Sequence, residues 1–261
     1  MDDLKKGVPM QPVLQNLEQG VLTLTLNRVD KKNALTAPMY ALLADALTAA
    51  QSNPEVRVVL MQGHETVFSA GNDIADFLQQ PPATTDSPVS RFLRGVAVFP
   101  KPLMAAVCGP AVGVGTTMLL HCDLVYAGDN AAFSMPFVNL GLCPEAASSL
   151  LAVHLMGYQR AAEALLMGDP FMVETALELG LISRVLPPSE VHAYAQSQAQ
   201  KMARKPLSSL LETKRLMKAA RTPAVLAQMD EEAQVFSRML KEPAAIEAFS
   251  AFMEKRKPVF S

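Results

Sequence analysis

Three short runs of apolar residues constrain the fold more than any other feature of this sequence. They are VRVVLMQG at 56–63, PLMAAVCG at 102–109 and CDLVYAG at 122–128, and each ends in glycine. Continuous apolar runs of this length are typical of strands buried on both faces of a parallel sheet. Helices between such strands imply right-handed crossovers. The sequence therefore predicts a layered α/β core.

The segments around these runs complete the alternation of strands and helices. β-Branched residues and leucines alternate at 20–27, which predicts a strand, and 181–186 predicts another. Residues 38–52 and 114–121 predict helices. The stretch 78–90 is rich in proline, serine and threonine, and we expect a mobile loop there, beside a site.

Helical patterns dominate after about residue 145. They cover 146–156, 158–167, 173–179, 188–203, 206–219, 223–240 and 242–255. Prolines lie at or near several of the proposed helix starts, where proline is tolerated. We interpret residues 1–187 as an α/β core and residues 188–261 as a helical C-terminal region of the same domain.

Composition and charge exclude several classes of protein. The chain has 261 residues, of which 50% are hydrophobic and 18% are charged, and this excludes a disordered chain. The net charge of −2 and the scattered Lys and Arg residues argue against nucleic acid as a partner. No run reaches the roughly 18 uninterrupted apolar residues of a membrane span, and the first residues do not resemble a secretory signal. We therefore expect a soluble, cytoplasmic protein that binds no membrane.

The cysteines and histidines form no pattern of a metal or nucleophile site. Cys108, Cys122 and Cys143 have neither Cys-x-x-Cys spacing nor clustered histidine partners. We interpret them as reduced, mostly buried thiols. The four histidines lie in no recognisable Ser–His or Cys–His motif. The sequence predicts no metal and no redox cofactor.

Two glycine-containing turns each lead from a predicted strand or a short loop into a predicted helix. They are VFSAGND at 67–73 and CGPAVGVGTTM at 108–118. Each presents backbone N–H groups at a helix start, where small residues let a ligand approach closely. Two such turns directed at one point would form an oxyanion hole from backbone amides alone. The alternative is that both are ordinary tight turns, and that Asp73 only caps the helix predicted at 74–79.

Glu145 is the only residue between Asp129 and Arg160 that is formally charged at neutral pH. It follows Pro144 and precedes the helical pattern of 146–156. One interpretation is structural, because an acidic residue in a first helical turn is favoured by the helix dipole. The other interpretation is a functional carboxylate in an apolar pocket.

Six segments, in their order along the chain, resemble the crotonase (enoyl-CoA hydratase/isomerase) superfamily. They are LTLNRVDKKNAL (24–35), FSAGNDIADF (68–77), KPLMAAVCGPAVGVGTTMLLHCDLVYAGDNAAFSMPFVNLGLCPE (101–145), ALLMGDPF (164–171), ALELGLISRVLP (176–187) and AFMEKRKP (251–258). The resemblance implies an α/β fold in which residues 1–187 form a spiral of ββα units and a helical C-terminal trimerisation region follows. It also implies an acyl-CoA thioester substrate and an active homotrimer or dimer of trimers.

The same resemblance implies that two backbone N–H groups stabilise a thioester enolate. The family pattern places these donors at Asn72 and Val114. The substrate-binding residues that it implies are Ser69, Ala70, Gly71, Asn72, Asp73, Gly113 and Val114. Lys31 and Lys32 are candidates for contacts with the phosphates of coenzyme A, and the family pattern adds Lys255 as a contact from a neighbouring subunit. Ordinary solvated lysines are the alternative.

The resemblance also distinguishes subgroups of the family. Hydratases carry two glutamates that hold and activate water, and Thr117 and Phe137 stand at those positions here. In peroxisomal-type Δ3,Δ2-enoyl-CoA isomerases the catalytic glutamate lies in a similar LG..PE segment, which LGLCPE matches with Glu145. One carboxylate in a dry pocket can remove a C2 proton from a 3-enoyl thioester and return it to C4.

We therefore expect a 3-enoyl-CoA isomerase of fatty-acid metabolism, with coenzyme A as part of the substrate and no further cofactor. Two alternatives stay open. One is a hydratase or another crotonase-type enzyme that acts on aromatic or branched acyl-CoAs. The other is a non-catalytic acyl-CoA-binding paralogue, which would keep both glycine turns without needing Glu145.

Overall fold

The computed structural model describes residues 11–79 and 86–260. Within them, a main sheet has six strands in the order β1-β2-β3-β4-β6-β9, and a smaller sheet has the order β5-β7-β8. The strands are β1 (Val13–Glu18), β2 (Val21–Leu26), β3 (Val58–Gln62), β4 (Leu103–Val107), β5 (Pro110–Val112), β6 (Leu124–Gly128), β7 (Ala132–Ser134), β8 (Phe171–Met172) and β9 (Arg184–Leu186). In the main sheet β1 is antiparallel to β2, and the other neighbours are parallel. The predicted α/β core is confirmed.

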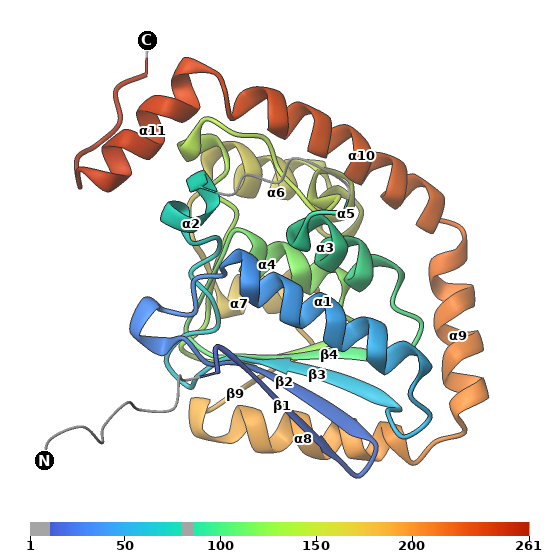
Figure 1. The fold of residues 1–261 in the computed structure, drawn as a ribbon. Coiled ribbons are helices and arrows are strands. Elements are labelled where there is room, and N and C mark those ends of the chain that lie inside the picture. Colours follow the sequence, from blue (N-terminus) through green and yellow to red (C-terminus); the bar gives the residue numbers. More distant parts are fainter. Residues whose placement is uncertain (1–10, 80–85, 261) are drawn as a thin grey trace, which may run out of the picture.

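Helices cover both faces of the main sheet. They are α1 (Ala37–Ser52), α2 (Ile74–Gln79), α3 (Pro88–Val98), α4 (Val114–Thr117), α5 (Ser148–Met156), α6 (Tyr158–Ala162), α7 (Val173–Glu178), α8 (Pro188–Ala203), α9 (Leu207–Ala219), α10 (Thr222–Met239) and α11 (Pro243–Met253). Short turns of 3-10 or π helix are η1 (Val29–Lys31), η2 (Met118–His121), η3 (Val138–Leu140) and η4 (Glu163–Met167). Figure 1 shows α8 along one face of the sheet, with α1, α3 and α4 over the other.

Successive residues of β3 point to opposite faces of the main sheet. Val58 and Leu60 share a buried cluster with apolar residues of α8, whereas Val59 and Met61 share one with residues of α1 and α3. Because both faces are covered, each position of β3 from Val58 to Met61 is apolar. This is why the sequence of such a strand is a continuous apolar run.

The loop predicted at 78–90 is wrong at both ends, and at its N-terminal end α2 extends through Gln79. Residues 80–85 lie outside the described residues, but α3 begins at Pro88. Pro88 occupies the first helical turn, and the Ser87 hydroxyl accepts a hydrogen bond from the Ser90 N–H at 3.2 Å. A proline and a serine that suggested a loop therefore start a helix instead.

The C-terminal helices α9, α10 and α11 run around the outside of the body (Figure 1), and we call them the C-terminal arm. Lys214 of α9 fixes the start of this arm, because its buried ammonium donates hydrogen bonds to Asp123 Oδ2 and to the Lys101 carbonyl, both at 2.7 Å. Further along, α10 contacts α3 and α5, and α11 contacts η3. The arm therefore contributes side chains to the region between α2, α3 and α5.

We expect Lys214→Met to lower the free energy of unfolding by about 2–3 kcal/mol, because it leaves the partly buried Asp123 carboxylate without its ionic partner. Urea unfolding measures this loss. Arg215→Met is the matched control, since the exposed ion pair of Arg215 with Glu212 should contribute almost nothing. Equal shifts of the unfolding midpoint in both variants would contradict this account of the arm.

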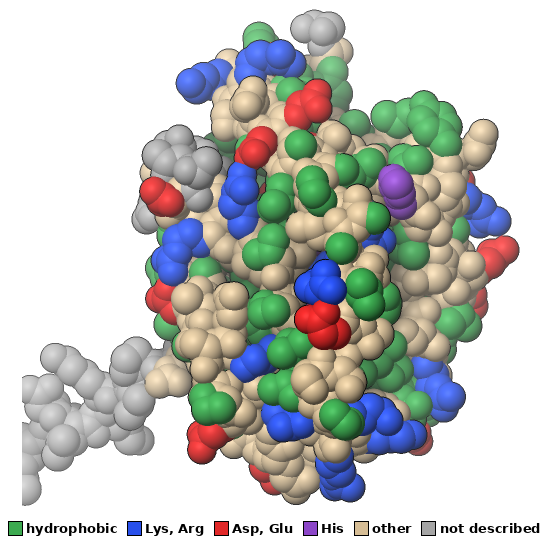
Figure 2. Space-filling model, turned by 90° about the vertical axis from the view of Figure 1, so that its right-hand side faces the viewer, with side chains coloured by type: hydrophobic (Ala, Val, Ile, Leu, Met, Phe, Trp, Pro, Cys, Tyr) green, Lys and Arg blue, Asp and Glu red, His purple; other side chains and the backbone are tan. Residues whose placement is uncertain are grey.

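Several large hydrophobic side chains of the C-terminal arm are exposed. They include Leu216, Met217, Ile246, Phe252 and Met253. Figure 2, which looks at the right-hand side of Figure 1, shows hydrophobic side chains at several places among charged ones. The homotrimer or dimer of trimers stays a prediction. Among the described residues, no helix is both long and apolar enough to cross a membrane.

Candidate active site

The two glycine turns lie side by side in the structure. The Ser69 carbonyl accepts a hydrogen bond from the Val112 N–H at 2.9 Å, and the Ser69 N–H donates to the Pro110 carbonyl at 3.1 Å. Gly71 has a φ of +88°, and a Cβ atom on it would lie 2.9 Å from the Val112 carbonyl oxygen. Only glycine combines this backbone conformation with so close an approach. The two turns are therefore in direct contact, and the convergence of their N–H groups on one point stays a prediction.

Both turns carry backbone donors that the protein leaves unused, and those of Asn72 and Val114 are among them. The N–H groups beside them are bonded: that of Asp73 donates to the Leu35 carbonyl and that of Gly113 donates to the Ser134 carbonyl, both at 2.9 Å. Among the described residues, no hydrogen bond uses the N–H of Asn72 or of Val114. Unpaired N–H groups of this kind are available to a ligand oxygen, which is the requirement of an oxyanion hole.

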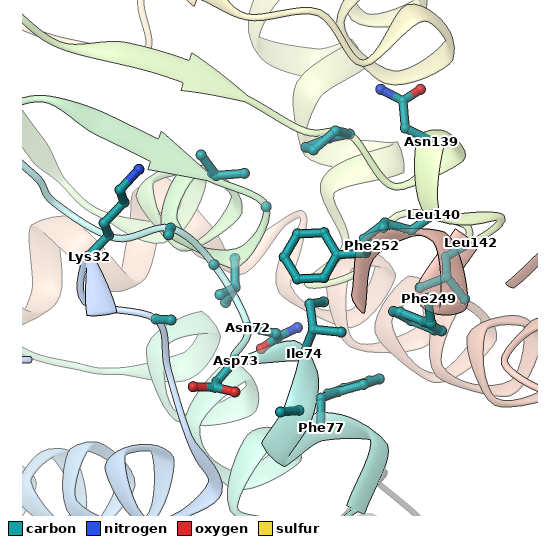
Figure 3. A pocket seen from close by; sticks show the side chains of 18 of the residues that line it. Lys32, Asn72, Asp73, Ile74, Phe77, Asn139, Leu140, Leu142, Phe249 and Phe252 are labelled. Carbon is teal, nitrogen blue, oxygen red and sulfur yellow. The ribbon is translucent and has the colours of Figure 1, made fainter. Parts of the chain in front are cut away.

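Asn72 and Val114 line a cavity of about 800 Å³, which we call the main cavity. Its wall is mostly apolar and includes Ile74, Phe77, Phe137, Leu140, Leu142, Phe236, Phe249 and Phe252. Figure 3 shows the Phe252 ring reaching from α11 into the cavity, toward the side where Asn72 and Ile74 lie. A long apolar ligand with one polar group near the two turns fits such a wall.

Most of the predicted substrate-binding residues line the main cavity, and one does not. Those that line it are Ala70, Gly71, Asn72, Asp73, Gly113 and Val114. Ser69 lies beneath the cavity wall and is fully buried. Its hydroxyl donates a hydrogen bond to the Asn33 carbonyl at 2.9 Å and accepts one from the Gly71 N–H at 3.2 Å. Ser69 therefore supports the glycine turn rather than facing a ligand.

Three lysines stand at the main cavity, and they are the three that the sequence singled out. Lys31, Lys32 and Lys255 all line it. Lys255 was expected from a neighbouring subunit, but here it reaches the cavity of its own chain, because α11 folds back over η3. Asp73 also lines the cavity, and its carboxylate accepts the Asp76 N–H at 3.2 Å and pairs with Arg28 at 2.6 Å, so its capping role is present as well.

Glu145 is buried, with 8% of its surface exposed. Its Oε1 atom has no hydrogen-bond partner among the described residues. Burial, and to a smaller extent the nearby negative charge of Glu232, together raise the pKa of the Glu145 carboxyl to about 8. A carboxyl group in this state can accept and release a proton near neutral pH.

Glu145 lies before the first turn of α5 rather than in it, and another side chain accepts hydrogen bonds at this helix start. Helix α5 begins at Ser148, and Glu232 of α10 accepts hydrogen bonds from the N–H groups of Ala147 at 2.6 Å and of Ser149 at 3.0 Å. The donors at this helix start are therefore satisfied by Glu232, which the sequence analysis did not single out. The only signal in the sequence was an acidic residue on an otherwise apolar face of α10.

Tyr40 contacts Asn72, one of the two donor residues, and lies near Glu145. Its hydroxyl donates a hydrogen bond to the side-chain oxygen of Asn72. Burial raises the pKa of Tyr40 well above its usual value, and the negative charge of Glu145 adds to this shift. Tyr40 thus contacts Asn72 and lies within electrostatic reach of Glu145.

Glu145 does not line the main cavity but a second one of about 450 Å³, which we call the side cavity. The side cavity lies between α3 and α10, and Phe236 lines both cavities. The ring of Phe236 packs edge-on against Phe77 at a centroid distance of 6.0 Å. Glu145 and the two amides therefore line two neighbouring cavities that share Phe236.

The two positions at which hydratases hold glutamates lack any base. Thr117 is fully buried and its hydroxyl has no partner among the described residues, and the buried Phe137 lines the main cavity. In the part of the chain that the structure describes, no group of three His, Cys, Asp or Glu side chains is placed to hold a metal ion. The arrangement combines the buried Glu145 carboxylate with two amide donors.

We expect Glu145→Gln to stabilise the folded protein, and increasingly so as pH rises. A buried carboxyl with a pKa raised from 4.5 to about 8 resists ionisation in the folded state, so wild-type stability falls as pH rises through this window. The glutamine cannot ionise and avoids the loss, which amounts to a few kcal/mol at about 1.4 kcal/mol per pKa unit. Urea unfolding near pH 5 and near pH 9 measures the difference. A difference that stays constant between these pH values would contradict the raised pKa.

Comparisons with known proteins agree on one family. The family model described as enoyl-CoA hydratase/isomerase matches residues 16–261. The 2,3-dehydroadipyl-CoA hydratase of Escherichia coli (strain K12) is 33% identical over 253 residues, which cover 96% of this chain and 99% of that protein. Enoyl-CoA delta isomerase 2 of Rattus norvegicus is 34% identical over 96% of this chain and 66% of its own length. The crystal structure of an enoyl-CoA hydratase/isomerase from Pseudoalteromonas atlantica T6c has a TM-score of 0.92 at 38% identity and covers 96% of this chain and 100% of that one. The chain therefore belongs to the enoyl-CoA hydratase/isomerase family, which is the crotonase superfamily.

Proposed function

We propose that this chain is a Δ3,Δ2-enoyl-CoA isomerase, which moves the double bond of a 3-enoyl-CoA to the 2-position. One observation carries the proposal: the buried Glu145 carboxylate and two unused amide donors line two cavities that share Phe236, while Thr117 and Phe137 stand at the positions of the water-activating glutamates of hydratases. Hydration needs groups that hold and activate water. Isomerisation needs one base that can also return a proton.

The proposed reaction consists of two proton transfers through one enolate. The Glu145 carboxylate removes a proton from C2, and the electron pair of that bond moves into the thioester carbonyl. The N–H groups of Asn72 and Val114 donate hydrogen bonds to the enolate oxygen. The Glu145 carboxylic acid then returns the proton to C4, and the double bond comes to lie between C2 and C3. No atom is gained or lost.

The surroundings of Glu145 suit this chemistry. A pKa of about 8 makes the Glu145 carboxylate a stronger base than an ordinary glutamate. It also lets the carboxylic acid keep the proton until the proton is transferred to C4. The apolar wall of the main cavity keeps water from the double bond. We assign the phosphates of coenzyme A to Lys31, Lys32 and Lys255, whose ammonium groups attract phosphate.

Absorbance assays on two substrates test the proposal. With 3-hexenoyl-CoA we expect the absorbance of the conjugated enoyl thioester to rise, and with crotonyl-CoA we expect no loss of that absorbance. Loss with crotonyl-CoA and no rise with 3-hexenoyl-CoA would replace the proposal by a hydratase. No change with either substrate, together with saturable binding of acyl-CoA, would point to a binding protein.

The value of kcat/KM for 3-hexenoyl-CoA should rise with pH and level off above the pKa of Glu145. The base acts only when it is ionised, so below about pH 8 each pH unit should lower kcat/KM about tenfold. Initial rates at low substrate concentration between about pH 6 and pH 10 measure this limb. An acid limb centred near 4.5, the ordinary value of a glutamate, would contradict the assignment.

A further inference from the structure

Glu232 of α10 is a second buried carboxylate at the catalytic segment, and no step of the proposed isomerisation uses it. Only 5% of its surface is exposed. Its Oε2 atom accepts the Ala147 N–H at 2.6 Å, and its Oε1 atom accepts both the N–H and the hydroxyl of Ser149. Three donors from the segment that follows Glu145 thus converge on one side chain.

These hydrogen bonds hold a strained turn. Ala146 and Ala147 directly follow Glu145 and have φ angles of +62° and +55°, a left-handed conformation that costs energy for any residue with a Cβ atom. Two such residues in succession persist only where their surroundings hold them. The His121 ring is hydrogen-bonded through Nε2 to the Ala146 carbonyl at 2.8 Å, and Glu232 binds the N–H of Ala147. The turn sets the direction in which the Glu145 side chain leaves the backbone.

Glu232 is also the one buried group near Glu145 that is suited to hold a negative charge. The titratable and charged groups around Glu145 come from several elements: Tyr40 of α1, Arg94 of α3, His121 of η2, Cys143 of its own segment, and Asp230 and Glu232 of α10. Arg94 and Asp230 form an ion pair with each other. Burial lowers the pKa of His121 to about 4, and burial raises the pKa of Cys143 to about 11, so both are neutral near pH 7.

The hydrogen bonds decide which of the two carboxyls keeps its proton. Burial raises the pKa of Glu232, but its three donors counteract that shift. The Oε1 atom of Glu145 has no donor among the described residues, and the pKa of Glu145 reaches about 8. A carboxylate that accepts several hydrogen bonds holds its charge more easily than one that accepts none. These contacts favour the proton on Glu145 and the charge on Glu232 in the resting site.

We infer that Glu232 is a positioning residue for Glu145: it holds the turn that aims the base, and its charge makes Glu145 bind its proton more tightly. The inference rests on the proposed function only in taking Glu145 as the base. The contacts and the charge are independent of which acyl-CoA reacts.

Two substitutions at Glu232 separate the charge from the contacts. Glu232→Gln removes the charge and keeps the shape, and we expect the acid limb of kcat/KM to move down by about 0.5–1 pH unit. Glu232→Asp keeps the charge but shortens the side chain, so kcat should fall while the acid limb stays near that of the wild type. Ser149→Ala is the control, because it removes one of the three contacts but no charge, and it should leave the acid limb in place.

A direct titration tests the inference without relying on activity. We would follow the side-chain carboxyl carbons of ¹³C-labelled protein by NMR and assign Glu145 from its missing signal in Glu145→Gln. In the wild type, Glu232 should ionise at lower pH than Glu145, and this measurement decides the question even if Glu232→Gln does not fold. A Glu232 that keeps its proton to a higher pH than Glu145, or a Glu145 pKa unchanged in folded Glu232→Gln, would overturn the inference. Failure of the isomerase proposal would be a separate result. The protein would then not turn over 3-hexenoyl-CoA, although Glu145 and Glu232 would still titrate in the expected order.

Discussion

Glu145→Gln is expected to lower the turnover of 3-hexenoyl-CoA by at least about 10²–10⁴-fold, the usual contribution of a general base. The loss should reach or exceed this range because Thr117 and Phe137 occupy the positions at which hydratases carry glutamates, and the Glu232 carboxylate is engaged by its three donors. Binding of the acyl-CoA should stay near that of the wild type, since the thioester is held by the amides of Asn72 and Val114. Steady-state kinetics and calorimetric binding measure the two quantities.

A matched control shows whether the loss belongs to this carboxylate. Glu163→Gln makes the same chemical change at an exposed position and should leave turnover unaltered. Thermal unfolding of both variants checks that they fold, and Glu145→Gln should be the more stable one at alkaline pH. A folded Glu145→Gln protein that keeps more than about a tenth of wild-type turnover would rule out Glu145 as the base, because such a loss is below the usual range.

Gly71→Ala is expected to lower kcat by about 10²–10³-fold, the effect of losing one oxyanion donor. Gly71 has a φ of +88°, and the new Cβ would lie 2.9 Å from the Val112 carbonyl oxygen, which cannot move without shifting the second turn. The change therefore displaces the N–H of Asn72, the next residue, and loosens the contact between the two turns. KM should change less than kcat, because the donor binds the enolate more strongly than the ground-state carbonyl.

Gly95→Ala is the control for this substitution. Gly95 lies in α3, where the nearest atom to a new Cβ is Leu47 Cδ1 at the ordinary distance of 3.7 Å. An alanine there should raise stability by about 0.5–1 kcal/mol and leave kcat unchanged. If Gly71→Ala folds and keeps kcat within about threefold of the wild type, the N–H of Asn72 is not a donor to the enolate.

The sequence predicted the parts of the fold that depend on local pattern. The apolar runs that became β3 and β4 were recognisable because covering helices make both faces of a parallel strand apolar. The strands β1, β5, β7 and β8 were not predicted, and the last three have only two or three residues, which are too few to show a period. Pro88 and Ser87 were interpreted as loop residues because the same residue types start helices and form turns.

In the candidate site, too, the sequence predicted the residues that stand out locally but not their tertiary contacts. Glu145 was conspicuous as one charge in an apolar segment, and the glycine turns were conspicuous as strand-to-helix junctions. The partner of Glu145 was not, because Glu232 lies 85 residues from Ala147 in the sequence and meets it only when α10 folds over α5. Ser69 was placed on the cavity wall by its motif, whereas tertiary hydrogen bonds turn its hydroxyl inward. Local pattern indicates which residues are unusual, and only packing decides which of them meet.

Transfer of deuterium from C2 to C4 tests the central claim, that one buried carboxylate performs both proton transfers. The substrate is 3-hexenoyl-CoA with both hydrogens at C2 replaced by deuterium, and mass spectrometry of the product is carried out at the earliest measurable turnover. Because Glu145 is buried, with 8% of its surface exposed, we expect part of the product to carry one deuterium at C2 and a second at C4. A product that carries only solvent hydrogen at C4 from the first turnover would contradict the claim, because the proton delivered there would then come from water or from another group.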